Sequence, residues 1–450
     1  MAFTPQQAIL ELGDAFYDPV TAARFPQTIL RFRNDRAAAE VGLDGLSDEQ
    51  WIAHFGRFEP LPGALQQPLA LRYHGHQFRV YNPEIGDGRG FLFAQMTDDR
   101  GRLMDLGTKG SGQTPYSRFG DGRLTLKGGV REILATEMLE ALGVETSRTF
   151  SLIETGEELH RGDEPSPTRS AVLVRLNHGH IRIGTFQRLA HSQDTENLLR
   201  LTGYVLRHYY GEEPGDDAPQ RLLAHVAART ARMAGQFMAA GFVHGVLNSD
   251  NINVTGESFD YGPWRFAPSW APGFTAAYFD QSGLYAFGRQ PEAIYWDVMQ
   301  LASSLRLIAE EEPLIEAMEV FPETFQREVA GAMLWRLGVV PRGPEHDRPL
   351  VGAIEAALVA SEAPIDRFFF DGFGGTLPER YGEPFADLRA QLAHYEARKP
   401  RDHAYWSDPA SCAMLIDEVE AIWAAIAQRD DWSPLETKVA AIRRMGEALA

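Results

Sequence analysis

A long amphipathic run that leads directly into a loop of acidic and amide side chains limits the folds available to this chain. Over residues 221–240 the apolar side chains recur at helical spacing, and Gly241 ends the run. The loop that follows contains Asp250 and Asn251, and Asp260 comes after a further short β-prone run. We expect these three side chains to lie close together, on two loops separated by a tight turn.

Carboxylate and amide groups in this order suit phosphoryl or nucleotidyl transfer. Hard oxygen ligands hold Mg²⁺ against phosphates, a carboxylate orients or deprotonates the attacking hydroxyl, and fixed positive charge stabilises the transition state. Protein kinases place a catalytic Asp, then an Asn, then a second Asp beyond the next strand. The same order occurs here, with Asp250 and Asn251 adjacent. The alternative is an ordinary turn with Asp260 as a cap, but the preceding helix and His244-Gly245 favour the kinase-like interpretation.

The character of the sequence changes twice along the chain. Residues 1–68 contain aromatic anchors and few glycines, which indicates an ordered N-terminal extension packed on the core. In residues 69–193, short β-prone runs alternate with glycine-rich turns around one helix, expected at 130–142. Residues 194–450 are mostly helical. This order favours an α+β, protein-kinase-like fold of two lobes, with a β-rich N-lobe that binds nucleotide phosphates and a helical C-lobe that carries the catalytic and metal loops.

Two glycine-rich segments of the N-lobe contain candidates for phosphate binding. In the first, Gly86, Gly88 and Arg89 precede a β-prone run, although Asp-Gly is also a common hairpin turn. In the second, Lys109 stands at a strand end beside glycines, with a spacing that does not match a P-loop. Kinases instead pair a lysine of the β-lobe with a helix glutamate, and Glu132 on the expected helix is the natural partner.

The overall charge of the chain makes a local cluster of basic residues informative. The chain has 43 Lys and Arg against 62 Asp and Glu, a formal net charge of −19. Such a surface repels phosphate backbones, so nucleic acid is not expected as a partner, and a nucleotide site needs its own positive charge. Arg175 and Arg182 would supply that charge together with Arg89 and Lys109, unless they form ordinary surface ion pairs.

Residue content disfavours several other kinds of site. The single cysteine, Cys412, excludes an intrachain disulfide and a cysteine-based zinc site and indicates a reducing, cytoplasmic location. No apolar run reaches the roughly 18 residues that a membrane span needs, and the N-terminal residues lack the pattern of a secretory signal, so we expect a soluble protein. The pairs His74/His76 and His178/His180 lack an evident third metal ligand, and we expect them to be structural.

Three groups of segments carry a further signal. They are 73–78 with 82–89, 109–118 with 120–123, and 244–251 with 260–263. Together they resemble the selenoprotein O family of protein adenylyltransferases, which is also described as pseudokinase-like, and the match covers about residues 70–305. The resemblance implies a kinase-like fold in which ATP binds flipped, so that its α-phosphate faces the acceptor. AMP would then pass to a Ser, Thr or Tyr hydroxyl of a protein substrate, and pyrophosphate would leave.

The family pattern also implies roles for individual residues. Asp250 would be the base, Asn251 and Asp260 would be the ligands of Mg²⁺ or, in its place, Mn²⁺, and Glu132 would orient Lys109. The pocket for ATP would be lined by Gly86, Gly88, Arg89, Lys109, Asp121, Gly122, Arg175, Arg182 and Asp260.

The chain also departs from the family pattern. Arg79 stands where the family usually has glycine, and the sequence ends without the family's short tail containing cysteine or selenocysteine. Redox control through a tail disulfide is therefore not expected. The region after about residue 310 does not resemble the family.

Two other functions use the same residue types. A conventional kinase-like phosphotransferase would act on a protein or a small molecule, and a non-catalytic scaffold would only bind ATP. A scaffold has no need for Asp250, Asn251, Asp260, Lys109 and Glu132 together. The requirements for ions and a base do not separate phosphate transfer from AMP transfer, so only the additional arginines and the family signature favour AMP transfer.

Overall fold

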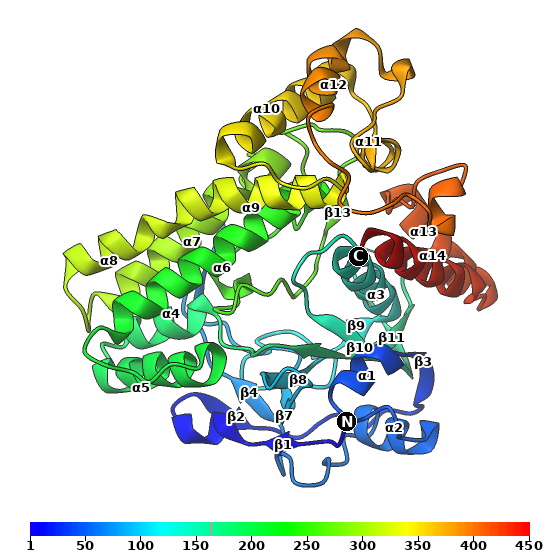
Figure 1. Cartoon of the computed structure of the whole chain (residues 1–450). Coiled ribbons are helices and arrows are strands. Elements are labelled where there is room, and N and C mark those ends of the chain that lie inside the picture. Colours follow the sequence, from blue (N-terminus) through cyan, green and yellow to red (C-terminus); the bar gives the residue numbers. More distant parts are fainter. Residues whose placement is uncertain (163) are drawn as a thin grey trace.

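A twisted antiparallel sheet lies at the centre of the N-lobe (Figure 1). The computed structural model describes residues 1–162 and 164–450. Its main sheet consists of β1 (Pro5–Gln6), β2 (Tyr17–Pro19), β3 (Ile29–Arg33), β4 (Leu69–Leu71), β7 (Leu92–Thr97), β8 (Leu103–Lys109), β9 (Leu124–Thr125), β10 (Arg148–Leu159) and β11 (Thr168–Asn177). The strand order is β2-β4-β7-β8-β11-β10-β3, with β1 paired to β7 and β9 paired to β11.

Helices form much of the remaining chain and, apart from the first two helices, lie mostly above the sheet in Figure 1. The N-lobe contains α1 (Asp35–Glu40), α2 (Asp48–Phe55) and α3 (Leu126–Ala141). The C-lobe contains α4 (Ile183–His191), α5 (Thr195–Val205), α6 (Ala218–Ala240), α7 (Gln290–Leu305), α8 (Glu311–Met318), α9 (Val320–Arg336), α10 (Pro344–Ser361), α11 (Ile365–Gly372), α12 (Ala386–Leu392), α13 (Ile416–Arg429) and α14 (Ser433–Leu449). The predicted α+β fold, with a β-rich lobe and a helical lobe, is therefore confirmed.

Two short hairpins lie beside the main sheet and matter for the site. One pairs β5 (Gly75–Gln77) with β6 (Val80–Asn82), and the other pairs β12 (Phe242–Val243) with β13 (Arg265–Phe266). The first joins the N-lobe to residues 244–251, the expected catalytic loop, because the backbone N–H of His76 donates to Ser249 Oγ at 2.7 Å. The two strands of the second flank, in sequence, the segment that contains Asp250 and Asp260.

The main sheet is buried on both faces, as the alternation of side chains along β11 makes clear. Leu173 packs in the core that contains α3, whereas Val172 and Val174 pack in a second core that contains Trp51 and Phe55 of α2. Successive side chains of a strand point to opposite faces, so an apolar run such as 171–174 fits only a sheet covered on both sides.

The first 68 residues contribute directly to the N-lobe. Strand β1 pairs with β7, β2 pairs with β4, and β3 pairs with β10. From α2, Trp51 stacks on Phe150 with ring centroids 4.9 Å apart, and its indole N–H donates to Ser151 Oγ at 2.9 Å. The separation of residues 1–68 as a distinct extension, with further boundaries at 193 and 194, stays a prediction.

Some element boundaries differ from the sequence prediction for local reasons. Helix α3 begins at Leu126 and not at residue 130, because the Thr125 hydroxyl caps it by accepting from Gly128 N at 3.2 Å. The sequence prediction missed this first turn because the pair Gly128-Gly129 disfavours a helix. A Cβ on Gly129 would lie 2.3 Å from Leu152 Cδ1, so glycine lets the helix approach the sheet closely. The β-prone run after Asn251 is not a named strand and forms only a bridge between Asn253 and Arg182.

Replacing Trp51 tests whether the N-terminal residues belong to the folding unit. Trp51→Ala removes a fully buried indole from the core beneath the sheet. We expect the free energy of unfolding to fall by about 3–5 kcal/mol, measured by urea denaturation. Leu10→Ala is the matched control, because Leu10 lies in the same segment but is 43% exposed. A Trp51→Ala protein as stable as this control would show that the segment is dispensable for folding of the lobe.

Candidate active site

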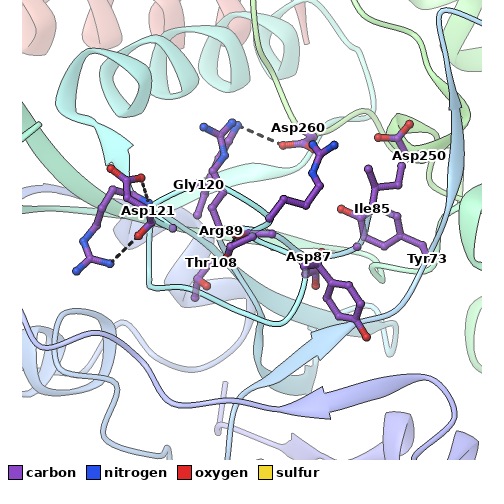
Figure 2. Close-up of a pocket in the computed structure, with 18 of the residues that line it drawn as sticks. Tyr73, Ile85, Asp87, Arg89, Thr108, Gly120, Asp121, Asp250 and Asp260 are labelled. Atoms are coloured by element: carbon purple, nitrogen blue, oxygen red, sulfur yellow. Dashed lines mark hydrogen bonds and ion pairs between the residues drawn. The ribbon is translucent and has the colours of Figure 1, made fainter. Parts of the chain in front are cut away.

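A cavity of about 650 Å³ lies where the glycine-rich loops of the N-lobe face the catalytic loop. Among the predicted site residues, it is lined by Gly86, Gly88, Arg89, Lys109, Asp121, Gly122, Arg175, Arg182, Asp250 and Asp260. In Figure 2, Asp121 and Asp250 lie at opposite ends of the cavity and Asp260 lies between them. Glu132 and Asn251 are not part of this lining.

Asp260 is the centre of an ion-pair cluster. Its Oδ1 lies 3.2 Å from Lys109 Nζ and 3.3 Å from Arg175 Nη1, and its Oδ2 lies 3.5 Å from Arg182 Nη1. Burial raises the pKa of this carboxyl, but the three cations more than offset that effect and hold the pKa well below its ordinary value. Asp260 therefore stays ionised. Its carboxylate contacts Lys109 of β8, Arg175 of β11 and Arg182, the residue before α4.

The predicted lysine–glutamate pair is present in the structure. Lys109 Nζ at the end of β8 lies 2.8 Å from Glu132 Oε2 on α3, and it also donates to the Tyr261 carbonyl at 3.2 Å. Glu132 Oε1 lies 3.6 Å from Arg175 Nη1. Lys109 and Glu132 are both buried, so the pair has little conformational freedom and fixes the lysine ammonium at the cavity wall.

Asp250 stands at the other end of the cavity in a different environment. Its Oδ1 is buried without a hydrogen-bond partner among the described residues, and Gly75 packs so closely that a Cβ there would lie 2.8 Å from it. Burial raises the pKa of Asp250 to about 6, although the charge of Arg182 acts in the opposite direction. Arg182 also fixes the backbone here, because its Nη1 donates to the Asp250 carbonyl at 2.9 Å. The Asp250 carboxyl can therefore exchange a proton near neutral pH.

The loop between these two acids is held by His244. Its backbone N–H donates to Gln290 Oε1 at 3.0 Å, and its Nε2 lies 3.1 Å from the Phe259 carbonyl. Asp260, directly after Phe259, has a φ of +63°, which costs an Asp roughly 1 kcal/mol or more. The histidine therefore serves to position the Asp260 carboxylate.

Asn251 lies on the same 3₁₀ turn as Asp250 (Ser249–Asn251), and its amide Nδ2 donates to the Val246 carbonyl at 3.0 Å. Its side-chain oxygen accepts no hydrogen bond within the described residues and is left for another partner. No group of three or more His, Cys, Asp or Glu side chains suited to a metal occurs in residues 1–162 and 164–450. One carboxylate and one amide oxygen fit a hard cation that takes its other ligands from phosphate and water.

The glycines of the two glycine-rich loops are required by packing. A Cβ on Gly86 would lie 2.5 Å from Tyr116 Cγ, and a Cβ on Gly88 would lie 2.9 Å from the Tyr116 carbonyl oxygen. A Cβ on Gly122, whose φ is +70°, would lie 2.3 Å from the backbone carbonyl of Gly112. The two glycine-rich segments therefore pack against each other and together form one side of the cavity.

The cavity concentrates positive charge in an acidic protein. Seven basic side chains line it (Arg89, Lys109, Arg118, Arg123, Arg161, Arg175 and Arg182), against the four carboxylates of Asp87, Asp121, Asp250 and Asp260. Such a balance attracts a polyanion.

Arg161 and Asp87 are two charged lining residues to which the sequence analysis assigned no role. Arg161 donates two hydrogen bonds to the Asp121 carboxylate, at 2.8 and 3.1 Å, from a loop whose sequence has no recognisable pattern. Asp87 lies 3.3 Å from Arg182 Nη2, and its position between Gly86 and Gly88 was the available signal.

Each of the histidine pairs has partners within the protein. His74 Nδ1 lies 2.7 Å from the Tyr81 hydroxyl, and His76 Nδ1 lies 2.6 Å from Gln187 Nε2. His178 Nδ1 lies 2.9 Å from the Leu103 carbonyl, and His180 Nδ1 lies 3.2 Å from Asp105. These contacts agree with structural roles.

Comparison with known proteins identifies the family of this site. Residues 1–373 match the family model described as "Protein adenylyltransferase SelO". The chain belongs to the SelO family. Proteins named protein nucleotidyltransferase YdiU are similar along almost all of it: that of Synechocystis sp. is 41% identical, covering 97% of each chain, and that of Gloeobacter violaceus is 43% identical, covering 98% of this chain and 95% of the relative. The resemblance inferred from the sequence motifs is confirmed.

SelO-type sequence extends further than the motifs indicated. The family model reaches residue 373, and the relative from Synechococcus elongatus, 42% identical, covers 99% of this chain. The prediction that the region after residue 310 lies outside the family is therefore wrong. Helices α8 to α14 lack site motifs and keep only an amphipathic pattern, which many unrelated helices share, so motif comparison could not follow them.

A solved structure gives a weaker likeness. The protein is ROP2 of Toxoplasma gondii, whose title describes a protein-kinase fold and no enzymatic activity. It is 9% identical, covers 73% of this chain and 93% of its own, and has a TM-score of 0.29. A score this low supports no conclusion about the SelO chain.

The lysine–glutamate pair can be tested through stability and ATP binding together. Lys109→Met leaves the Glu132 carboxylate buried, with only the 3.6 Å contact to Arg175. We expect a loss of about 3 kcal/mol in the free energy of unfolding and much weaker ATP binding, measured by thermal denaturation with and without ATP.

The control for this substitution is Lys127→Met on the same helix as Glu132. Lys127 forms a partly exposed pair with Glu420 at 2.8 Å, so its loss should change stability by about 0.5 kcal/mol or less. Equal effects of the two substitutions would contradict a special role for Lys109.

Proposed function

We propose that this chain transfers AMP from ATP to Ser, Thr or Tyr hydroxyls of proteins, with release of pyrophosphate. Membership of the SelO family is the observation that favours AMP transfer over phosphate transfer. The cavity supports the proposal, because it combines a cationic cluster for phosphates with a carboxylate of raised pKa. A cytoplasmic reaction is part of the proposal and is supported by the content of a single cysteine.

Two groups of cations would bind the phosphates of ATP. Lys109, Arg175 and Arg182 meet at Asp260, whereas Arg89, Arg123 and Arg161 line the same cavity from the glycine-rich loops. A triphosphate bound between these groups has its charge neutralised along its length. Because Lys109, Arg175 and Arg182 are fixed by ion pairs and are buried, they need little rearrangement as charge develops in the transition state.

Asp250 completes the reaction as the base. The acceptor oxygen attacks the α-phosphorus while its proton passes to the Asp250 carboxylate. The bond from the α-phosphorus to the oxygen that bridges to the β-phosphate breaks, and pyrophosphate leaves with the electron pair. The Asp250 side chain lines the cavity, so its carboxylate is the group available to take the proton.

Asp260 and Asn251 would hold a divalent cation, Mg²⁺ or Mn²⁺. When bound, the cation would neutralise phosphate charge and orient the leaving group. Asp260 suits this role because its side chain is 25% exposed, facing the cavity, and because its low pKa keeps it ionised.

A conventional phosphotransferase remains the second candidate, because it needs the same base and the same cations. A non-catalytic scaffold is disfavoured by Asp250, whose buried carboxylate is costly to ionise and whose Oδ1 has no hydrogen-bond partner within the described residues.

Labelled ATP separates the candidate functions. We expect incubation with a protein acceptor, Mg²⁺ and ATP labelled on the α-phosphate to give a labelled protein with the mass gain of AMP. Label from the γ-phosphate, with the mass gain of phosphate, would make the protein a kinase. ATP binding without any transfer would make it a scaffold. Asp260→Ala, expected to lose metal-dependent transfer, is the negative control.

The pKa of Asp250 sets the expected pH dependence. The base must be deprotonated to act, so kcat/KM should fall about tenfold per pH unit below about pH 6 and level off above it. The measurement is the initial rate of transfer as a function of pH at saturating metal. Asp250→Asn should lower kcat by about 10²–10⁴-fold and abolish this limb of the profile. A rate that continues unchanged down to pH 5 would exclude Asp250 as the base.

A further inference from the structure

Three aromatic side chains form an exposed patch near the catalytic loop. Phe78, Phe279 and Tyr278 are 36%, 46% and 84% exposed. Their rings are in contact, with centroids 5.8 Å apart between Phe78 and Phe279 and 5.2 Å apart between Tyr278 and Phe279. Single exposed apolar residues are ordinary, but contiguous exposed aromatic residues mark a binding surface. We call these three residues the aromatic patch.

The patch is attached to the catalytic loop on both of its sides. On one side, the backbone N–H of Phe78 donates to Asn248 Oδ1 at 3.0 Å. On the other, the Tyr285 hydroxyl donates to the same oxygen at 2.6 Å, and the Tyr285 ring lies 5.1 Å from that of Phe78. Asn248 stands two residues before Asp250. The aromatic patch and the proposed base therefore share one rigid support.

The segment that carries Tyr278 and Phe279 has a fixed conformation. The next residue, Asp280, is buried, and its carboxylate accepts from the backbone N–H groups of Leu284 and Tyr285, each at 2.8 Å. These bonds close the turn behind the two aromatic residues. The rings are thus presented to solvent by a rigid turn.

Phe78 is displayed by a strained hairpin. The two residues between β5 and β6, Phe78 and Arg79, both have positive φ angles, +49° and +63°. Two-residue turns of this kind favour Asn-Gly, and bulky residues in this conformation are uncommon. Such strain persists where surrounding contacts enforce it, and it is concentrated at binding and catalytic sites.

Glu292 pairs with both arginines nearest the patch and offsets part of their charge. Arg79 lies 3.3 Å from Glu292 and over the ring of Trp296, and Arg289 lies 3.6 Å from the same Glu292. The patch therefore suits an uncharged, apolar group.

The position of the patch identifies its occupant. Gln77, the neighbour of Phe78, lines the cavity together with Asp250. A protein hydroxyl that reaches Asp250 must bring adjoining residues of its own chain past this end of the cavity. We propose that the aromatic patch docks an apolar side chain of the protein substrate, a few residues from the acceptor hydroxyl on an extended segment. This inference rests on the proposed function and adds a substrate preference to it.

The first test measures docking without catalysis. The probe is a fluorescent peptide of Gly, Ala and Asn with one Phe and no hydroxyl, and the readout is anisotropy in the presence of ATP. Burial of a phenyl ring corresponds to about a tenfold change in affinity or more. We expect the double substitution Tyr278→Ser/Phe279→Ser to weaken binding about tenfold relative to the unmodified protein.

The matched control is Ile315→Ser on α8, which removes an apolar side chain that is 54% exposed. It should bind the peptide as the unmodified protein does. Equal binding by all three proteins, or no binding by any, overturns the docking proposal. Thermal denaturation and ATP binding identify any variant that fails to fold, and in that case the single substitution Phe279→Ser replaces the double one.

The second test measures transfer. Peptides with one acceptor Thr or Tyr and a Phe at successive positions on either side are compared with a peptide that lacks Phe. We expect Phe at a preferred position to lower KM about tenfold without changing kcat, and the double variant to lose this preference. Transfer that ignores the Phe overturns the docking proposal alone. Peptide binding that depends on the patch, with no AMP transfer to any acceptor, overturns the proposed function alone.

Discussion

The carboxylate of Asp260 determines how the two lobes meet. Lys109 and Arg175 from the strands of the N-lobe, and Arg182 from the residue before α4, approach within 3.5 Å of its oxygens. Charges that interact in a poorly solvated site do so far more strongly than in water, so without this carboxylate the cations would repel one another. The positive φ of Asp260 and the contact from His244 to Phe259 serve this arrangement. ATP would bring more negative charge to the same cations, and binding would extend an electrostatic network that already exists.

The residues that stand on regular elements could be predicted from the sequence. Lys109 ends a strand and Glu132 lies in the second turn of a helix, so a pairing known from kinases follows from the sequence alone. The amphipathic run before Gly241 likewise predicted α6 and thereby the position of the catalytic loop. In these cases local periodicity predicts the direction of the side chains. Only the distance between the partner residues depends on the fold.

The residues that depend on long-range pairing could not be predicted. Strands β1 to β3 are too short to show an alternating pattern, and β3 finds its partner β10 more than a hundred residues later. Arg161 comes from an irregular loop and is identified only by its contact with Asp121. The direction of the Asn251 amide depends on the Val246 carbonyl, which no spacing rule encodes.

Helix α14 packs on α3, the helix that carries Glu132, although the family model ends at residue 373. Arg443 forms two bonds to Glu137, at 2.8 and 2.6 Å and 306 residues apart in sequence, and a Cβ on Gly446 would lie 3.2 Å from Ala141. A chain emerging from the ribosome folds its earlier segments first. The face of α3 that contacts α14 therefore stays uncovered until α14 has been synthesised. Assembly of the site is in this way coupled to synthesis of a helix that contributes no residue to it.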